Sequence, residues 1–210
     1  MKRIILADDH SFIRQGLIRI LKEKYPLVEI VEVGDAESLL NEVIKNNFDF
    51  VISDLDMPGR SGLESLEQIK LFKPELPVLI LSIYAEELYA VRALKAGASG
   101  YMNKNAAPSE LLIAVERILL GKKYITAEIG EKLLLHFNSD KNPHELLSNR
   151  ELEIFKLLAS GKSLTNISES LSLALSTVST HRTKVLRKLD CKSNSDLTRY
   201  AIYNNIITEY

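Results

Sequence analysis

The sequence is poor in cysteine and in long apolar runs. Its 210 residues include one cysteine, Cys191, which excludes an internal disulfide bond and fits a reducing compartment. No apolar stretch approaches the roughly 20 residues that a membrane-spanning helix needs. Asp8 and Asp9 interrupt the first apolar run too early for a secretory signal. These absences predict a cytoplasmic protein with no membrane partner.

A large excess of one charge is also missing, since 27 Lys and Arg stand against 28 Asp and Glu. This balance excludes a uniformly basic surface for nucleic acid but allows a local basic patch. The net charge is −3 over residues 1–137 and +2 over residues 138–210, so the two parts of the chain differ. The basic excess of the second part is concentrated at Arg182, Lys184, Arg187, Lys188 and Lys192.

Residues 1–121 alternate between short β-rich runs and longer helical patterns. Continuous apolar strands that alternate with helices indicate a parallel sheet covered on both faces. The expected fold class is therefore α/β, with a doubly wound five-stranded parallel sheet that binds ligands beyond the carboxyl ends of its strands. The sequence predicts strands at 3–8, 28–33, 48–53, 77–82 and 100–102, and helices at 12–24, 36–46, 62–72, 85–96 and 108–120.

The pattern changes after residue 121. Residues 122–144 predict a linker, in which a helical pattern at 127–137 precedes the turn-forming stretch NSDKNPH. Residues 145–210 show no strand alternation and predict a small all-α domain. Ser148 and Glu151 match the capping-box pattern at the start of its first helix. The four helices are expected at about 148–159, 164–171, 176–189 and 194–204.

Polar side chains stand where the predicted strands of the first domain end. Asp8 and Asp9 follow the first strand, Asp54 ends the third, Ser82 ends the fourth, and Lys104 follows the fifth. Because the carboxyl ends of parallel strands share one edge, we expect these side chains to converge in one pocket. Crowded carboxylates repel one another unless a hard cation such as Mg²⁺ lies among them. A solvated turn explains any single acid, but the shared position of all five residues favours a phosphoryl-binding pocket.

The segments LADDH, VISDLDMPGRSGLE, VLILSIY and KAGASGYMNK occur in this order, and they resemble the receiver domain of two-component response regulators, a flavodoxin-like fold. The resemblance covers residues 1–121. It implies that the carboxylate of Asp54 is the phosphoacceptor, which attacks the phosphohistidine of a cognate sensor histidine kinase. The further residues that it implies are the Mg²⁺ ligands Asp8, Asp9, Asp54 and Asp56 (by its backbone carbonyl), the phosphoryl-pairing Lys104, and the switch pair Ser82 and Tyr101, whose ring rotates inward.

The pair Asp54-Leu-Asp56 also fits the D-x-D motif of haloacid dehalogenase-like phosphatases, which is an enzymatic alternative. Those enzymes place the motif after their first strand, with a hydroxyl residue two positions beyond the second Asp. Here the motif follows the third predicted strand, and Pro58 occupies that position. The sequence therefore favours a regulator that accepts a phosphoryl group and is not an enzyme.

The segment STVSTHRTKVLRKL, residues 176–189, is amphipathic at helical spacing. Val178, Val185 and Leu189 share one side, and the opposite side carries hydroxyls and cations. With the preceding helix it predicts a helix-turn-helix whose second helix enters a major groove. On charge alone, a solvated helix face would explain the same residues.

Residues 145–207 resemble the LuxR-type DNA-binding domain in their L-S-x-R-E opening, T-V-x-x-H core and R-K-L end. A receiver followed by this domain is the NarL/FixJ type of response regulator. Ser179 stands where the family commonly has Lys, so we expect a weaker salt dependence of DNA binding. The predicted DNA-binding residues are Thr177, His181 and Lys188 near phosphates, Ser179, Thr180 and Thr183 facing base edges, and the cations Lys184 and Arg187.

The sequence thus predicts a transcription regulator whose binding to double-stranded DNA is controlled by phosphorylation, and which forms a homodimer when phosphorylated. In the family the last helix contributes to dimerisation of the DNA-binding domains, but Leu197, Tyr200 and Ala201 also suit core packing, and both interpretations stay open. The alternative function is a phosphorylation-independent DNA-binding regulator whose receiver serves only for dimerisation.

Overall fold

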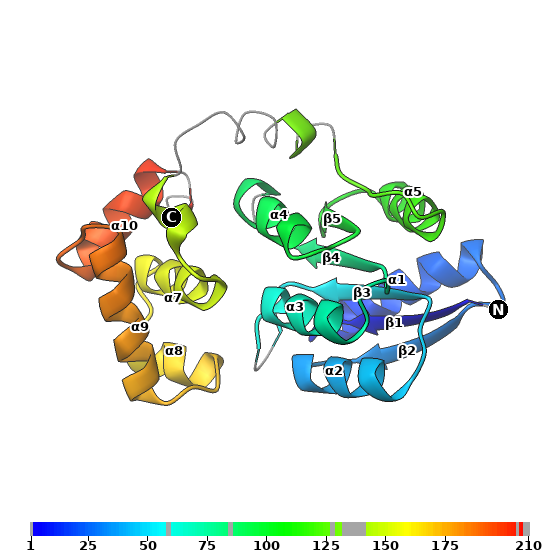
Figure 1. Ribbon diagram of the computed structural model, residues 1–210, viewed down its shortest axis with the longest axis horizontal. Helices are drawn as coiled ribbons and strands as arrows, with labels where there is room; N and C mark the ends of the chain where they lie inside the picture. Colours follow the sequence, from blue (N-terminus) through cyan, green and yellow to red (C-terminus); the bar gives the residue numbers. More distant parts are fainter. Residues whose placement is uncertain are drawn as a thin grey trace. The chain divides into compact units, whose positions relative to one another are not determined.

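In the computed structural model the chain forms two units, Met1–Leu135 and His136–Tyr210 (Figure 1). The structure describes residues 2–57, 60–83, 86–126, 129–131, 142–204 and 206–207. Most of the helical pattern predicted at 127–137 lies outside these ranges. None of the helices within them has the length and apolar character that crossing a bilayer requires.

A five-stranded parallel sheet forms the centre of the first unit. Its order is β2-β1-β3-β4-β5, which confirms the predicted doubly wound α/β class. β3 and β4 are buried at every residue because helices cover both faces of the sheet, whereas the edge strand β2 exposes Glu29 and Glu32. The strands are β1 (Arg3–Ala7), β2 (Glu29–Val33), β3 (Phe50–Asp54), β4 (Val78–Ser82) and β5 (Gly100–Asn103).

Helices form a layer on each face of this sheet (Figure 1). α1 and α5 pack together on one face, and α2, α3 and α4 are neighbours on the other. Beyond α5, the Tyr124 amide donates to the Ser99 carbonyl at 2.9 Å, so the first residues of the predicted linker contact the edge of the sheet. The helices are α1 (Ser11–Lys24), α2 (Ala36–Lys45), α3 (Gly62–Phe72), α4 (Glu86–Lys95) and α5 (Pro108–Leu119).

Side-chain caps fix where two of these helices begin. The carboxylate of Asp35 accepts from the amide of Ser38 at the start of α2, and the hydroxyl of Ser61 accepts from the amide of Glu64 at the start of α3. Such caps satisfy amides that have no partner in the first helical turn. The cap at Ser61 marks the start of α3, the helix that follows Asp54 in the chain.

The second unit is all-α within the residues that the structure describes, as the sequence predicts. Its core includes Leu152 and Phe155 of α7, Val178 and Val185 of α9, and Leu197 of α10. Ser148 and Glu151 form the predicted capping box at the start of α7. The elements are the 3₁₀ helix η1 (Pro143–Leu146), α7 (Asn149–Ala159), α8 (Leu164–Ser170), α9 (Leu175–Lys188) and α10 (Asn194–Tyr203).

Candidate functional site: an acidic pocket and an exposed helix

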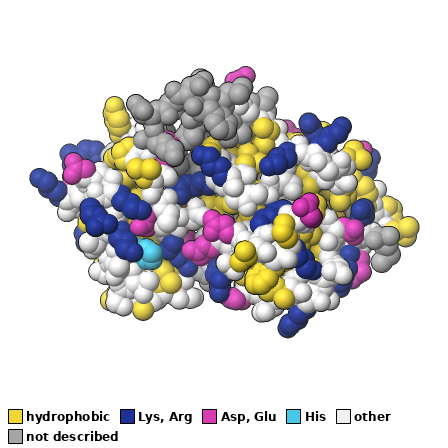
Figure 2. Space-filling view, in the orientation of Figure 1, with side chains coloured by type: hydrophobic (Ala, Val, Ile, Leu, Met, Phe, Trp, Pro, Cys, Tyr) yellow, Lys and Arg dark blue, Asp and Glu magenta, His cyan; other side chains and the backbone are white. Residues whose placement is uncertain are grey.

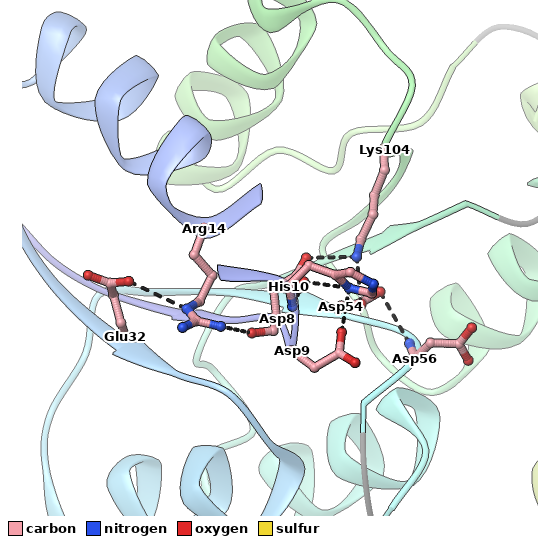
Figure 3. Close-up of polar contacts among 8 residues, drawn as sticks. All are labelled: Asp8, Asp9, His10, Arg14, Glu32, Asp54, Asp56 and Lys104. Atoms are coloured by element: carbon pink, nitrogen blue, oxygen red, sulfur yellow. Dashed lines mark hydrogen bonds and ion pairs between the residues drawn. The ribbon is translucent and has the colours of Figure 1, made fainter. Parts of the chain in front are cut away.

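The acidic pocket lies at the carboxyl ends of β1, β3 and β5 (Figure 3). β1 and β3 are neighbours in the sheet, so Asp8 and Asp54 come together although they are far apart in the sequence. Both residues are buried, with 0% and 2% of their surface exposed. The Nζ atom of Lys104 reaches between them, 2.7 Å from Asp8 Oδ2 and 2.6 Å from Asp54 Oδ2. The predicted convergence of these three residues is therefore present.

Backbone groups hold the two buried carboxylates in place. The amide of His10 donates to Asp8 Oδ1 at 2.8 Å, and the amide of Asp56 donates to Asp54 Oδ1 at 3.2 Å. In Figure 3 the carboxylate of Asp56 points away from the pocket. The side chain of Asp56 is thus turned away from Asp54, in keeping with the prediction that only its backbone carbonyl serves the site.

Arg14 supports the pocket from α1 and was not among the predicted site residues. Its guanidinium donates to the backbone carbonyl of Asp8 and pairs with Glu32 at 3.4 Å (Figure 3). α1 begins three residues after Asp8, so the first turn of this helix lies beside the end of β1. The signal in the sequence was a basic residue in the first turn of the helix that follows the acidic pair.

Burial dominates the electrostatics of Asp54 and raises the pKa of its carboxyl to about 6. Lys104 opposes this rise by its hydrogen bond and charge, and the negative charge of Asp8 adds to it. Burial disfavours the charged form of Lys104 too, but hydrogen bonds and charges from Asp54 and Asp8 outweigh it, so the pKa of Lys104 is raised. Without a further cation the pocket therefore holds more negative charge than Lys104 offsets.

The donor atoms in the pocket suit a hard divalent cation. Asp8, Asp9, His10 and Asp54 each offer one ligand atom, and these atoms lie within 4.8 Å of one another. The His10 ring lies against Asp9, with Nδ1 2.6 Å from Asp9 Oδ1. Carboxylate oxygens are the ligands that Mg²⁺ prefers, so the three acids fit the predicted cofactor.

The two predicted switch residues lie inside the same unit. Ser82 ends β4 with 1% of its surface exposed, and its carbonyl accepts from the backbone amide of Lys104 at 2.8 Å. Tyr101 on β5 is fully buried, so its ring already occupies an inward position in this structure. The strand ends that carry Ser82 and Lys104 are thus joined directly by a hydrogen bond.

Replacing Lys104 by Met is expected to lower the free energy of unfolding of the first unit by about 3 kcal/mol near pH 7 without metal, because two buried carboxylates lose their cation. A carboxyl whose pKa is higher in the folded than in the unfolded chain destabilises the fold only above the pKa of the unfolded chain. The loss of unfolding free energy in the Lys104→Met chain should therefore shrink as the pH falls toward about 4. Calorimetry of the full chain measures both effects. Lys95→Met, on the exposed end of α4, is the matched control. A loss that changes with neither pH nor Mg²⁺ would contradict this electrostatic origin.

The exposed face of α9 carries most of the predicted DNA-binding residues. Val178 and Val185 are buried in the second unit, while Thr177 and His181 are half-buried at its flank. Figure 2 shows Lys and Arg side chains spread over this unit, in dark blue at the left. The exposed residues of α9 include Ser176, Ser179, Thr180, Thr183, Lys184 and Arg187.

Lys188 differs from these residues because its amine is bound within the unit. Its Nζ lies 2.6 Å from Oε2 of the buried Glu151 and 3.1 Å from the carbonyl of Leu146. Burial would raise the pKa of Glu151, but Lys188 and the amide of Ser148 outweigh it and lower that pKa. Lys188 therefore ties the end of α9 to the start of α7, a role that sequence reasoning did not assign to it.

Two family models match the chain. The model described as the response regulator receiver domain matches residues 4–116, and the model of bacterial regulatory proteins of the luxR family matches residues 145–201. The first range contains all of the acidic pocket, and the second contains all of α9.

Curated and solved proteins match along nearly the whole chain. The oxygen regulatory protein NreC of Staphylococcus haemolyticus is 34% identical over 214 residues, which cover 98% of this chain and 99% of that protein. RcsB from Salmonella enterica serovar Typhimurium, solved bound to promoter rprA in the presence of the phosphomimetic BeF₃⁻, is 26% identical with a TM-score of 0.65, covering 95% of this chain and 98% of RcsB. A structure of two RcsB dimers bound to two parallel DNAs is 27% identical with a TM-score of 0.60, covering 95% and 97%.

Proposed function

Because the chain belongs to the response regulators that join a receiver domain to a LuxR-type DNA-binding domain, we propose that Asp54 accepts a phosphoryl group from a sensor histidine kinase and that this controls DNA binding by α9. One observation carries the proposal: the ammonium of Lys104 lies within 2.7 Å of two buried carboxylates at the edge of the sheet. A positive group held there is placed to meet the oxygens of an arriving phosphoryl group.

The chemistry follows from the groups around Asp54. An Asp54 oxygen attacks phosphorus, the bond from phosphorus to the kinase imidazole breaks, and an acyl phosphate forms. Lys104 then pairs with a phosphoryl oxygen in place of the carboxylate. Asp8, Asp9, Asp54 and the backbone carbonyl of Asp56 would hold Mg²⁺, which would further neutralise the phosphoryl oxygens when bound. Attack requires ionised Asp54, and a pKa of about 6 leaves this form dominant near pH 7.

Phosphorylation would act on DNA binding by shifting the receiver between two populations. Ser82 and Tyr101 are the proposed switch residues, because one ends β4 at the pocket edge and the other lies in the adjacent strand. The favoured state forms a homodimer, and a two-fold dimer reads two half-sites on double-stranded DNA. We propose that this takes place in the cytoplasm, where a bacterial regulator meets its DNA.

The proposed working parts are a receiver at 1–121, a linker at 122–144 that begins with the sheet contact of Tyr124, and a DNA-binding domain at 145–210. Within the last part, Lys188 serves to position α9 through Glu151. The proposed DNA contacts are Thr177, Ser179, Thr180, His181, Thr183, Lys184, Arg187 and also Lys188, whose side chain keeps 33% of its surface exposed.

A small phosphodonor with Mg²⁺ is expected to tighten the binding of the full chain to its DNA by roughly 5- to 150-fold, the usual size of coupling between two sites. Gel-shift titrations on fragments of the host genome measure this, and Asp54→Asn is expected to bind equally with and without the donor. Equal affinity of the unsubstituted chain in both conditions would favour the phosphorylation-independent regulator instead.

A further inference from the structure

Two threonines on the exposed face of α9 turn their hydroxyl groups back onto the helix. Thr180 Oγ1 donates to the carbonyl of Ser176 at 2.9 Å, and Thr183 Oγ1 donates to the carbonyl of Ser179 at 3.1 Å. Threonine commonly makes this bond to the carbonyl four residues earlier. The hydrogen of each hydroxyl is therefore directed at the helix backbone and away from whatever faces α9.

Both side chains lie in the middle of the outward face. At 100° per residue, Thr180 and Thr183 flank the line opposite Val178 and Val185, which are buried in the domain. The two threonines are three residues apart, so they are neighbours on the helix surface. An object that docks on this face meets both of them at once.

With their hydroxyl hydrogens engaged, these exposed threonines have the γ-methyl group and the lone pairs of the oxygen left for contact with a docked molecule. In a major groove the matching apolar group is the C5-methyl of thymine, which no other standard base carries. We propose that α9 reads thymine methyl groups through the γ-methyl groups of Thr180 and Thr183. This inference rests on the proposed DNA-binding function and names what that function recognises.

Two exposed cations near the threonines are suited to other contacts with the DNA. Lys184 and Arg187 are exposed on the C-terminal side of Thr183 along the helix, where they suit phosphates or guanine. The competing use of each threonine is to donate its hydroxyl to a base. That use requires breaking the bond to the helix carbonyl, and the two uses make opposite predictions for two conservative substitutions.

The first experiment changes the DNA. The full chain, with phosphodonor and Mg²⁺, selects its binding site from a pool of random duplexes of about 30 base pairs. Each thymine of the selected duplex is then replaced singly by uracil, which removes only the methyl group. We expect one or two thymines in each half-site at which the change weakens binding about fourfold, the value of one buried methyl. Equal affinity for every uracil-substituted duplex would overturn the inference.

The second experiment changes the protein, with Val or Ser placed at positions 180 and 183. Thr180→Val and Thr183→Val keep a methyl and cannot donate a hydrogen bond, whereas Thr180→Ser and Thr183→Ser keep the hydroxyl and lose the methyl. The Val variants are expected to bind within about twofold of the unsubstituted chain, and each Ser variant to bind about fourfold more weakly. Each Ser variant should also become insensitive to uracil at its own thymine.

The reverse order, with Ser retained and Val weakened, would assign the reading to the hydroxyls and overturn the inference. Both positions are exposed, so the Val and Ser variants should fold alike, and a matching circular dichroism melt checks this. Failure of the full chain to retain any duplex from the pool would instead overturn the proposed function. Binding that is strong but indifferent to uracil would overturn the methyl readout alone.

Discussion

Replacing Asp54 by Asn is expected to abolish the uptake of phosphate from a small phosphodonor, whereas Asp56→Asn should retain it. The amide of Asn is not a nucleophile toward phosphorus, so no acyl phosphate can form. Asp56 differs because its carboxylate points away from the pocket and its backbone serves the site (Figure 3). Intact-mass measurement of each purified full chain, after incubation with donor and Mg²⁺, detects the added phosphoryl group.

The two Asp→Asn variants form a matched pair, because they make the same chemical change two residues apart. Uptake by Asp54→Asn at the rate of the unsubstituted chain would remove Asp54 from the role of phosphoacceptor. Loss of uptake in both variants, together with turnover of phosphate esters by the unsubstituted chain, would favour the D-x-D phosphatase. Retained uptake in Asp56→Asn is the outcome that separates the two interpretations, since that phosphatase motif needs both side chains.

The order and type of the elements could be predicted because periodicity reports burial directly. β3 and β4 begin with apolar runs, FVI and VLIL, and both strands are buried at every residue. Once the sheet is parallel, its carboxyl ends must share an edge, so the meeting of Asp8, Asp54 and Lys104 followed from topology alone. The matching family models confirm the prediction of a receiver followed by a LuxR-type domain.

Contacts that depend on side-chain conformation could not be predicted in this way. A helical wheel places Lys188 on the flank of α9 but does not say that Glu151 of α7 lies opposite it. The same limit applies to Arg14, whose guanidinium reaches the carbonyl of Asp8. The hydroxyl bonds of Thr180 and Thr183 are local, yet a threonine in a helix chooses between rotamers that the sequence does not distinguish. Each of these contacts decides which groups of a side chain are left to bind a ligand, although the residue's position in the fold is the one predicted.

The second large effect is expected from a substitution at Gly62, which packs closely against the backbone of Asp54 and Leu55. A Cβ atom on Gly62 would lie 2.6 Å from the carbonyl oxygen of Asp54 and 2.7 Å from Cα of Leu55. Backbone atoms cannot rotate away, so either the start of α3 or the end of β3 must move. Gly62→Ala is therefore expected to lower the free energy of unfolding of the first unit by about 3 kcal/mol. Because β3 carries Asp54, phosphate uptake by the folded fraction should also slow.

Gly16→Ala is the matched control, because a Cβ on Gly16, an exposed residue within α1, has nothing within 4 Å. Alanine stabilises an exposed helix interior relative to glycine, so this variant should gain about 0.5 to 1 kcal/mol. The same added methyl group is thus expected to act with opposite signs at two glycines of one domain. Calorimetry of both full-length variants measures the signs, and intact-mass kinetics follows phosphate uptake. A Gly62→Ala chain as stable as the unsubstituted one would show that α3 does not begin against the backbone of Asp54. It would also contradict the close packing inferred behind the proposed phosphoacceptor.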